Sequence, residues 1–176
     1  GCMYYQGEGV PQDYSEAIKW YRKAADQGFD EAQIKLGEMF YKGIGVSKDY
    51  SEAAKWYRKA ADQGHVEAQC QLGFMYDEGI GVSQNYLESV KWYRKAADQG
   101  HVEALYSLGW VYYDKYNKPV SPDYSEAVKW FRKAADQGHV KAQTQLGYIY
   151  FLGEDCIPQD YSESAKWYRK AADQGN

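Results

Sequence analysis

A ten-residue stretch that recurs along the chain constrains the fold more than any other feature of the sequence. It reads KWYRKAADQG at residues 19–28 and returns four more times, once with Phe131 in place of the tyrosine. Self-similarity at this period is typical of a solenoid, in which each unit buries its apolar side chains against its neighbours. We therefore predict one array over residues 1–176. Its five copies are marked, 36 to 38 residues apart, by Trp20, Trp56, Trp92, Trp130 and Trp167.

Each repeat is predicted to contain two helices, here called helix A and helix B. In helix A of the second repeat, Ala32, Leu36 and Phe40 recur at helical spacing. The array is expected to be a piece of a longer one, with residues 1–6 as the second half of a severed helix A. Helix A is predicted at residues 30–42, 66–78, 102–116 and 140–152, and helix B at residues 13–27, 49–63, 85–99, 123–137 and 160–174.

Polar residues and glycines mark the helix ends. Asp49 opens helix B, and Glu52 lies three residues after Asp49. This spacing predicts a capping box, in which the aspartate accepts a first-turn N–H and the glutamate reaches back to the aspartate N–H. Gly43 and Gly64 are predicted to end the two helices. Gly37 lies inside helix A at a cost of about 1 kcal/mol, so its recurrence predicts the close approach of a neighbouring helix.

A fixed set of positions recurs with this spacing. In the second repeat these are Ala32, Leu36, Gly37, Phe40, Gly43, Gly45, Val46, Asp49, Tyr50, Ala53, Trp56, Tyr57, Lys59, Ala60, Ala61 and Gly64. The pattern resembles the Sel-one-like repeat (SLR), an offshoot of the tetratricopeptide-like helical repeats. The resemblance implies an all-α solenoid of helix-turn-helix repeats, wound as a right-handed superhelix with helices A on the concave side. It also implies a non-enzymatic scaffold or adaptor that binds a partner protein or peptide, and a role in bacterial virulence or host interaction.

The cysteines bear on compartment and on the branch of the family. Cys2, Cys70 and Cys156 occupy unrelated positions of the repeat, whereas a disulfide framework needs an even, patterned set. We expect free thiols in a reducing compartment, either the cytoplasm or a host cytosol after secretion, and the periplasm stays open as an alternative. One branch of the SLR family holds each repeat with its own disulfide. This chain lacks such cysteine pairs, which weighs against a close relation to that branch.

Charge and motif spacing disfavour several classes of function. The net charge of −4 argues against nucleic acid and anionic membranes, whose binding needs a basic field. The sequence has no apolar run of about 18 residues, so no membrane insertion is predicted. His65, His101 and His139 share one repeat position and are predicted to be loop residues. They cannot share a metal ion, because neighbouring helices pack about 8–10 Å apart. No metal or cofactor is expected.

An enzyme of β-lactam or peptidoglycan chemistry is the main alternative, because such activity has been linked to some members of the resembling family. That chemistry normally uses a Ser-x-x-Lys motif, and no serine of this chain has a lysine three residues on. The sequence therefore predicts no enzymatic activity. A structural spacer between flanking domains is a third possibility.

The candidate binding face lies where the repeats differ from one another. Positions 34, 38 and 41 of helix A, with their equivalents, share one helical face at spacings i, i+4 and i+7. In the fourth repeat this face carries Trp110, the one tryptophan outside the repeated stretch, and tryptophan and tyrosine are frequent binding anchors. The alternative is that the aromatic residues only pack against the unusual turn at residues 115–119. The predicted contacts of a partially positive partner are Glu38, Tyr41, Phe74, Asp77, Tyr106, Trp110, Tyr113, Asp114, Tyr148 and Phe151.

Overall fold

The computed structural model describes residues 1–114, 122–154 and 156–175, and within these ranges the chain forms ten α-helices. The odd-numbered helices are the predicted helices A and the even-numbered ones the predicted helices B, so the all-α solenoid of five repeats is confirmed. The helices are α1 (Cys2–Gln6), α2 (Tyr14–Ala25), α3 (Asp30–Lys42), α4 (Tyr50–Asp62), α5 (Val66–Glu78), α6 (Tyr86–Asp98), α7 (Val102–Tyr113), α8 (Tyr124–Asp136), α9 (Val140–Leu152) and α10 (Tyr161–Ala172).

The predicted helix bounds differ from the observed ones at both ends of helices B and at the end of α7. Helices B end one or two residues earlier than predicted: α4 ends at Asp62 rather than at residue 63, and α2 ends at Ala25 rather than at residue 27. Helices B begin one residue later than predicted, because the cap residue keeps an extended backbone, as Asp49 does with φ −141° and ψ 95°. Helix α7 ends at Tyr113 rather than at residue 116, because Asp114 leaves the helical conformation with φ −67° and ψ 110°. Residues 115 and 116 of that prediction lie outside the described residues.

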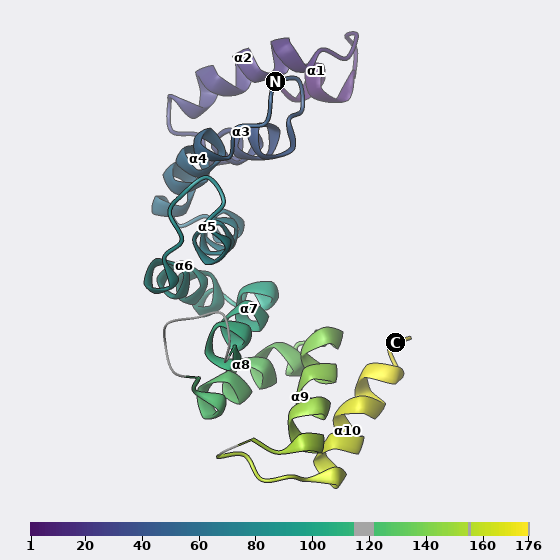
Figure 1. The fold of residues 1–176 in the computed structure, drawn as a ribbon. Coiled ribbons are helices and arrows are strands. Elements are labelled where there is room, and N and C mark those ends of the chain that lie inside the picture. The colour runs from purple at the N-terminus through teal and green to yellow at the C-terminus, as the bar shows by residue number, and fades with distance from the viewer. Residues whose placement is uncertain (115–121, 155, 176) are drawn as a thin grey trace. The chain divides into compact units, whose positions relative to one another are not determined.

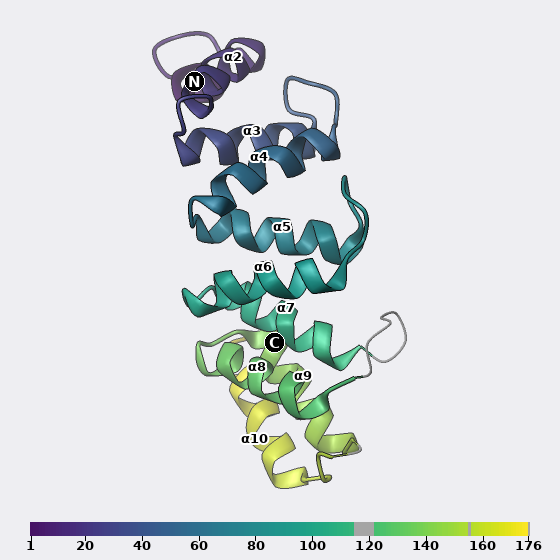
Figure 2. The same ribbon diagram turned by 90° about the vertical axis from the view of Figure 1, so that its left-hand side faces the viewer.

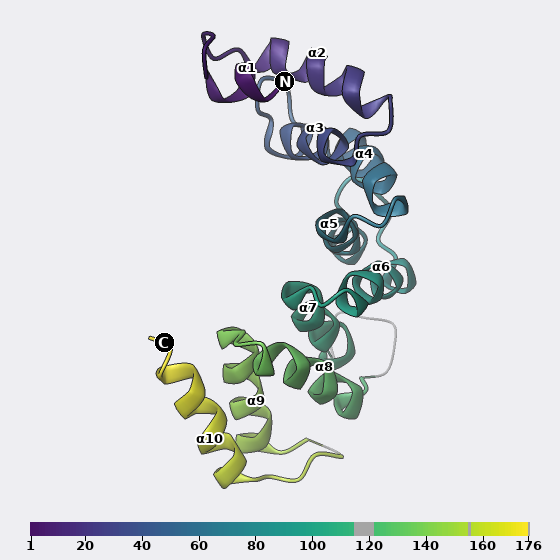
Figure 3. The same ribbon diagram turned by 180° about the vertical axis from the view of Figure 1, so that it is seen from behind.

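Figure 1 labels the helices along the chain. They divide into two compact units, residues 1–92 and 93–176, with the division inside α6. In the first unit α1 packs on α2, and each of α2, α3 and α4 packs on the helix that follows it, so that α3, α4 and α5 form successive layers (Figure 2). In the second unit α7 packs on α8, α8 on α9 and α9 on α10. The last two helices lie side by side in Figures 1 and 3.

Both units have a core built from equivalent positions of the repeat. In the first unit Leu36 and Met39 of α3 are completely buried. In the second unit Leu146 and Ile149 of α9 are completely buried at the same repeat positions. Burying an aliphatic side chain of this size contributes about 1.5–3 kcal/mol relative to leaving it exposed. Each helix pair therefore depends on its neighbours within the unit for most of its stability.

The recurrent glycine inside helix A gives room to an aromatic ring of helix B. A Cβ atom added to Gly37 would lie 2.8 Å from the ring of Tyr57, and one added to Gly109 would lie 2.4 Å from the ring of Phe131. Both distances are far below van der Waals contact. The predicted close approach is confirmed, and the approaching group is a side-chain ring rather than the backbone of the neighbouring helix.

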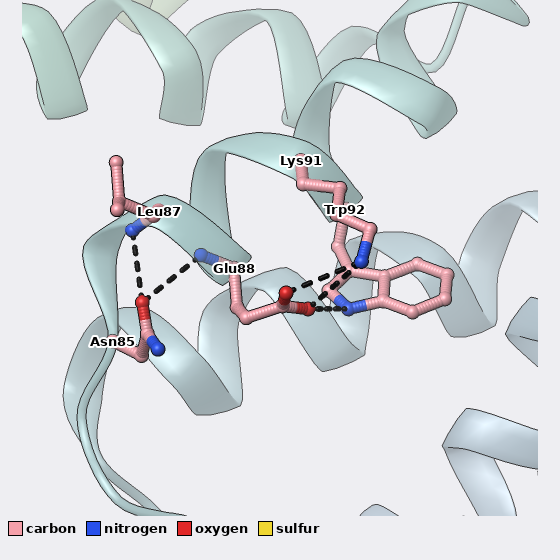
Figure 4. A network of polar contacts seen from close by, with 5 residues as sticks. All are labelled: Asn85, Leu87, Glu88, Lys91 and Trp92. Atoms are coloured by element: carbon pink, nitrogen blue, oxygen red, sulfur yellow. Dashed lines mark hydrogen bonds and ion pairs between the residues drawn. The ribbon is translucent and has the colours of Figure 1, made fainter.

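The predicted capping box is half correct. The cap side chain accepts the predicted N–H. Asn85 Oδ1 accepts from the backbone N–H of Glu88 at 3.1 Å (Figure 4). In the second repeat Asp49 Oδ1 accepts from the backbone N–H of Glu52 at 2.9 Å. The predicted reciprocal contact, between the glutamate side chain and the backbone N–H of the cap residue, is wrong. The backbone N–H of Asp49 donates instead to the carbonyl oxygen of Phe40 in α3, at 3.0 Å. The end of helix A therefore satisfies this donor, and the glutamate is available for other partners.

The glutamate instead binds side chains of its own helix. Glu88 accepts the indole Nε1–H of Trp92 at 3.1 Å and a hydrogen bond from Lys91 Nζ at 3.2 Å (Figure 4). Glu52 accepts the indole N–H of Trp56 in the same way, at 3.1 Å. Both tryptophans are buried, so the contact satisfies a polar atom that would otherwise be buried without a partner.

Candidate functional site

The predicted face of the second unit carries five aromatic side chains, which we call the aromatic face. Three of them are unusually exposed for large apolar side chains, with exposed fractions of 36% for Trp110, 45% for Tyr148 and 48% for Phe151. Tyr106 and Tyr113 are half-buried. Helix α7 supplies Tyr106, Trp110 and Tyr113, and α9 supplies Tyr148 and Phe151.

Trp110 is held in place from its buried side. Its ring centroid lies 5.7 Å from that of Phe131, 6.2 Å from that of Tyr106 and 5.6 Å from that of Tyr113, all with nearly perpendicular planes. Phe131 is completely buried. Edge-to-face pairs of this kind contribute about 0.5–1.5 kcal/mol beyond the area that they bury. Trp110 is therefore oriented before any partner binds, with its remaining surface open to solvent.

Tyr113 connects α7 to the segment that follows α9. Its hydroxyl donates a hydrogen bond to Oε1 of Glu154 at 2.9 Å. Burial raises the pKa of Tyr113 well above its ordinary value, and the hydrogen bond to Glu154 raises it further. Both causes favour the neutral phenol that donates this bond, so the contact is retained at neutral pH and holds one edge of the aromatic face in position.

Tyr106 is positioned by a histidine that caps α9. The rings of Tyr106 and His139 lie 4.5 Å apart between centroids, at an interplanar angle of 37°. Nδ1 of His139 accepts the N–H of Ala142 at 3.1 Å, and Nε2 lies 3.2 Å from Oε2 of Glu103. Because Nδ1 acts as the acceptor, the ring proton lies on Nε2 and is donated to Glu103.

The other two histidines cap helices A in the same way. Nδ1 of His65 accepts from Ala68 at 3.5 Å, and Nδ1 of His101 accepts from Ala104 at 3.2 Å. The sequence prediction placed the three histidines in loops and missed this role. The available signal was their constant position immediately before each helix A.

A groove opens beside Tyr106 in the second unit. It has a volume of about 530 Å³ and is also lined by Lys141 and Thr144 of α9 and by Tyr168 of α10. Tyr168 is 38% exposed. Pockets that bind small ligands have volumes of roughly 300–1,000 Å³, so this groove is large enough to hold one or two side chains of a peptide beside the aromatic face.

The first unit presents a different surface at the same repeat positions. Ile34 and Cys70 are buried there, whereas Phe74 is 36% exposed. Glu38 and Tyr41 line a smaller groove of about 250 Å³ formed by residues of α3, α4 and α5. The predicted face is therefore not uniformly accessible. In two repeats the side chain at its first position, Ile34 or Cys70, is buried in the packing between helices.

The three predicted acidic contacts have separate surroundings. Glu38 Oε2 pairs with Lys35 Nζ at 2.9 Å, and this hydrogen bond raises the pKa of Lys35. Asp77 is half-buried on α5, and Asp114 is half-buried immediately after α7.

The alternative interpretation of the aromatic residues was that they only pack against the turn at residues 115–119. That turn lies outside the described residues. The described packing partners of the aromatic face are Phe131, Tyr124, His139, Glu154 and Tyr161.

Within residues 1–114, 122–154 and 156–175, no three His, Cys, Asp or Glu side chains are grouped so that they could hold a metal ion. None of the helices in the described part of the chain combines the length and apolar character needed to cross a bilayer.

Comparison with known proteins places this geometry in a context. The family profile of the Sel1 repeat matches residues 1–29, 30–65, 66–101, 102–139 and 140–176. A comparison with curated protein sequences gave no significant match.

Several solved structures are similar to the chain. A protective antigen present in uropathogenic Escherichia coli strains, which displays an SLR fold, is 35% identical with a TM-score of 0.91, over 99% of this chain and 37% of the antigen. A Sel1 repeat protein from Oxalobacter formigenes is 40% identical with a TM-score of 0.86, over 99% of this chain and 68% of that protein. Cysteine-rich protein B of Helicobacter pylori is 28% identical with a TM-score of 0.51, over 53% of this chain and 71% of that protein. The chain thus spans little more than a third of the length of the antigen.

Proposed function

Because the chain belongs to the Sel1 repeat family, whose members mediate protein–protein interactions, we propose that it is a scaffold or adaptor that binds a segment of a partner protein on the aromatic face. The partner segment is extended or helical and inserts apolar side chains between the exposed rings of α7 and α9. The protein acts by holding its partner and carries out no chemical step.

The observation that carries this proposal is the state of Trp110. It is partly exposed and yet packed edge-to-face on Phe131, Tyr106 and Tyr113. Tryptophan and tyrosine are over-represented among the residues that dominate binding energy. A ring that is already fixed loses little rotational freedom on binding. Trp110 therefore supports the proposal both by its type and by its rigidity.

The charge of the chain supports a partner with some positive charge. The net charge is −4, and Asp114 and Glu154 lie at the ends of the segments that carry the aromatic face. Complementary charge at the rim of an interface raises the rate of association more than it raises the final affinity. The apolar contact of the rings would thus supply most of the affinity.

The similarity to a protective antigen of uropathogenic Escherichia coli supports a partner on the host side. It bears on the source of the partner and not on the chemistry of the face. Parallel captures from a bacterial lysate and from a human-cell lysate distinguish the two sources.

The experiment uses the full chain and a triple variant, Trp110→Ala, Tyr148→Ala and Phe151→Ala, as baits in affinity capture. Circular dichroism of both baits establishes that the variant keeps its helices. We expect a protein that the wild-type chain retains and the variant loses, and we expect Trp110→Ala alone to weaken its binding by about 2 kcal/mol or more.

The matched control removes exposed apolar side chains from helices B instead. Trp20 and Leu87 are 47% and 77% exposed, so the double variant Trp20→Ala and Leu87→Ala should retain the same protein as the wild-type chain. If the triple variant retains it equally well, or if only the control variant loses it, the binding site is not the aromatic face.

A further inference from the structure

The groove of the first unit, which we call the polar groove, differs in chemistry from the aromatic face. Its volume is about 250 Å³. Its charged lining residues are Glu38 and Lys42 of α3 and Glu67 of α5, and Tyr57 of α4 also lines it. The lining therefore has one more negative than positive charge.

The hydroxyl of Tyr57 is an unused polar group at this groove. Tyr57 is only 3% exposed, and its hydroxyl makes no hydrogen bond to any described residue. A hydroxyl oxygen without a partner is either fully enclosed by protein or in contact with open space. The oxygen of Tyr57 is not fully enclosed, and Tyr57 lines the groove, so the oxygen borders the groove. Buried tyrosine hydroxyls normally find a hydrogen-bond partner. This one is positioned to take a partner from outside the chain.

Two carboxylates, of Glu38 and Glu67, line the same groove as Tyr57. Burial raises the pKa of Tyr57, and the charges of Glu38 and Glu67 raise it further. Internal contacts orient both carboxylates: Lys35 Nζ binds Oε2 of Glu38 at 2.9 Å, and Gln71 Nε2 donates to Oε1 of Glu67 at 2.8 Å. Oε1 of Glu38 receives no hydrogen bond from the described residues. The groove thus presents acceptors from α3, α4 and α5 to one small space.

The equivalent positions of the second unit show that stacking does not require these groups. Trp110 stands at the repeat position of Glu38, Phe131 at that of Tyr57, and Lys141 at that of Glu67. Both carboxylates and the hydroxyl are replaced together, and the helix pairs still form with Phe131 completely buried. The polar set is therefore a property of this groove rather than of the fold.

We propose that the polar groove binds the guanidinium group of an arginine side chain carried by the protein partner. The proposal rests on the proposed function only in that the arginine belongs to the same partner. A guanidinium is planar, carries five N–H donors and binds carboxylates through paired hydrogen bonds. The hydroxyl of Tyr57 accepts a further donor. An anion would be repelled by Glu38 and Glu67, and an apolar side chain would remove the Tyr57 hydroxyl from water without giving it a partner.

The test is an NMR titration of the ¹⁵N-labelled full chain with two small probes. Nα-acetyl-arginine amide carries the guanidinium, and Nα-acetyl-citrulline amide has nearly the same shape without the charge. We expect the arginine probe to shift the resonances of Tyr57 and Gln71, and the citrulline probe to bind about tenfold or more weakly, as expected for the loss of a charged hydrogen bond.

Two variants and a control assign the site. Tyr57→Phe introduces the residue that the chain already has at position 131, so the variant is expected to fold. It should weaken binding of the arginine probe several-fold, and Glu67→Gln should weaken it about tenfold. Asp62 is exposed on α4 and does not line the groove, so Asp62→Asn should bind the probe as the wild-type chain does.

Three results would overturn the proposal. These are equal affinity for the two probes, shifts confined to residues outside the groove, and no binding of the arginine probe at all. The titration involves neither the partner nor the aromatic face, so it can fail while the capture experiment succeeds, and the reverse also holds. Failure of each idea is thereby distinguishable.

Discussion

The ring of Phe131 on α8 lies in the space that a side chain on Gly109 of α7 would occupy. A Cβ atom at Gly109 would approach Cδ1 of this ring to 2.4 Å and Cε1 to 2.5 Å. Phe131 is completely buried and also supports Trp110, with 5.7 Å between ring centroids. The absence of one side chain therefore determines where the ring beneath the aromatic face can lie.

Replacing Gly109 by alanine should destabilise the second unit. Alanine favours a helix over glycine by about 1 kcal/mol, but the added methyl group collides with the ring of Phe131, which is completely buried. Overpacking of this kind costs about 1–3 kcal/mol. We expect a net fall in the thermal midpoint, measured by circular dichroism, together with a change in the near-ultraviolet signal of Trp110.

The double variant Gly109→Ala and Phe131→Leu is the control for this prediction. A smaller side chain at position 131 relieves the collision, so the two changes together should cost less than the sum of the single changes. A strictly additive result would mean that the ring moves away without cost and that the close approach does not determine the packing.

Glu52 and Glu126 occupy the same repeat position and should differ in their contribution to stability. Glu52 accepts the indole N–H of Trp56 at 3.1 Å, whereas the indole N–H of Trp130 has no partner among the described residues. Removing an acceptor from a buried donor costs about 1–3 kcal/mol. Glu52→Ala should therefore lower the midpoint of chemical unfolding more than Glu126→Ala does.

The comparison is internally controlled, because both glutamates also pair with a lysine three residues on. Glu52 contacts Lys55 and Glu126 contacts Lys129, each at 3.1 Å. Exposed pairs of this kind contribute about 0.3–0.5 kcal/mol, and this loss is common to both variants. Equal destabilisation would show that the indole contact adds nothing measurable.

Tyr57 should make the chain less stable at alkaline pH. Burial, followed by the charges of Glu38 and Glu67, raises the pKa of Tyr57 in the folded state. Below the unfolded-state pKa of about 10 the phenol is neutral in both states, and its contribution to stability is fully present. Above about pH 10 only the unfolded state loses the proton, so the free energy of unfolding falls as pH rises towards the folded pKa, by about 1.4 kcal/mol per pH unit for this one group.

Chemical unfolding at a series of alkaline pH values measures this slope. Tyr57→Phe removes one titrating phenol. The number of protons released on unfolding should therefore fall by about one, and the free energy of unfolding should decline less steeply with pH. Leu87→Ala leaves every phenol in place and should show the slope of the wild-type chain. An unchanged slope in Tyr57→Phe would mean that the hydroxyl is already ionised or solvated in the folded chain.

The local features of the fold could be predicted because they depend on neighbours in sequence. The apolar spacing of Ala32, Leu36 and Phe40 and the position of Asp49 before helix B were sufficient for the helix pairs and for the N–H that Asp49 accepts. The partner of Glu52 could not be predicted in this way. It depended on Phe40 first taking the N–H of Asp49, which is a contact between two helices.

The candidate site was only partly visible in the sequence. Its aromatic members could be named, because they interrupt a nearly constant repeat, but their exposure could not. Ile34 and Cys70 share the helical position of Tyr106 and are nevertheless buried. The role of Tyr57 was also missed, although the single replacement of this tyrosine by Phe131 was a signal that stacking does not need the hydroxyl.

By itself the sequence determined the solenoid, its period and the approximate helix ends, because a repeated pattern of apolar, capping and glycine residues has one way to bury its apolar positions in each unit. Only the tertiary structure decided which variable side chains remain open, which ring fills the space over Gly109, and which polar groups of the first unit share one groove. Those outcomes depend on volumes and orientations contributed by two or three helices at once. No single repeat contains that information.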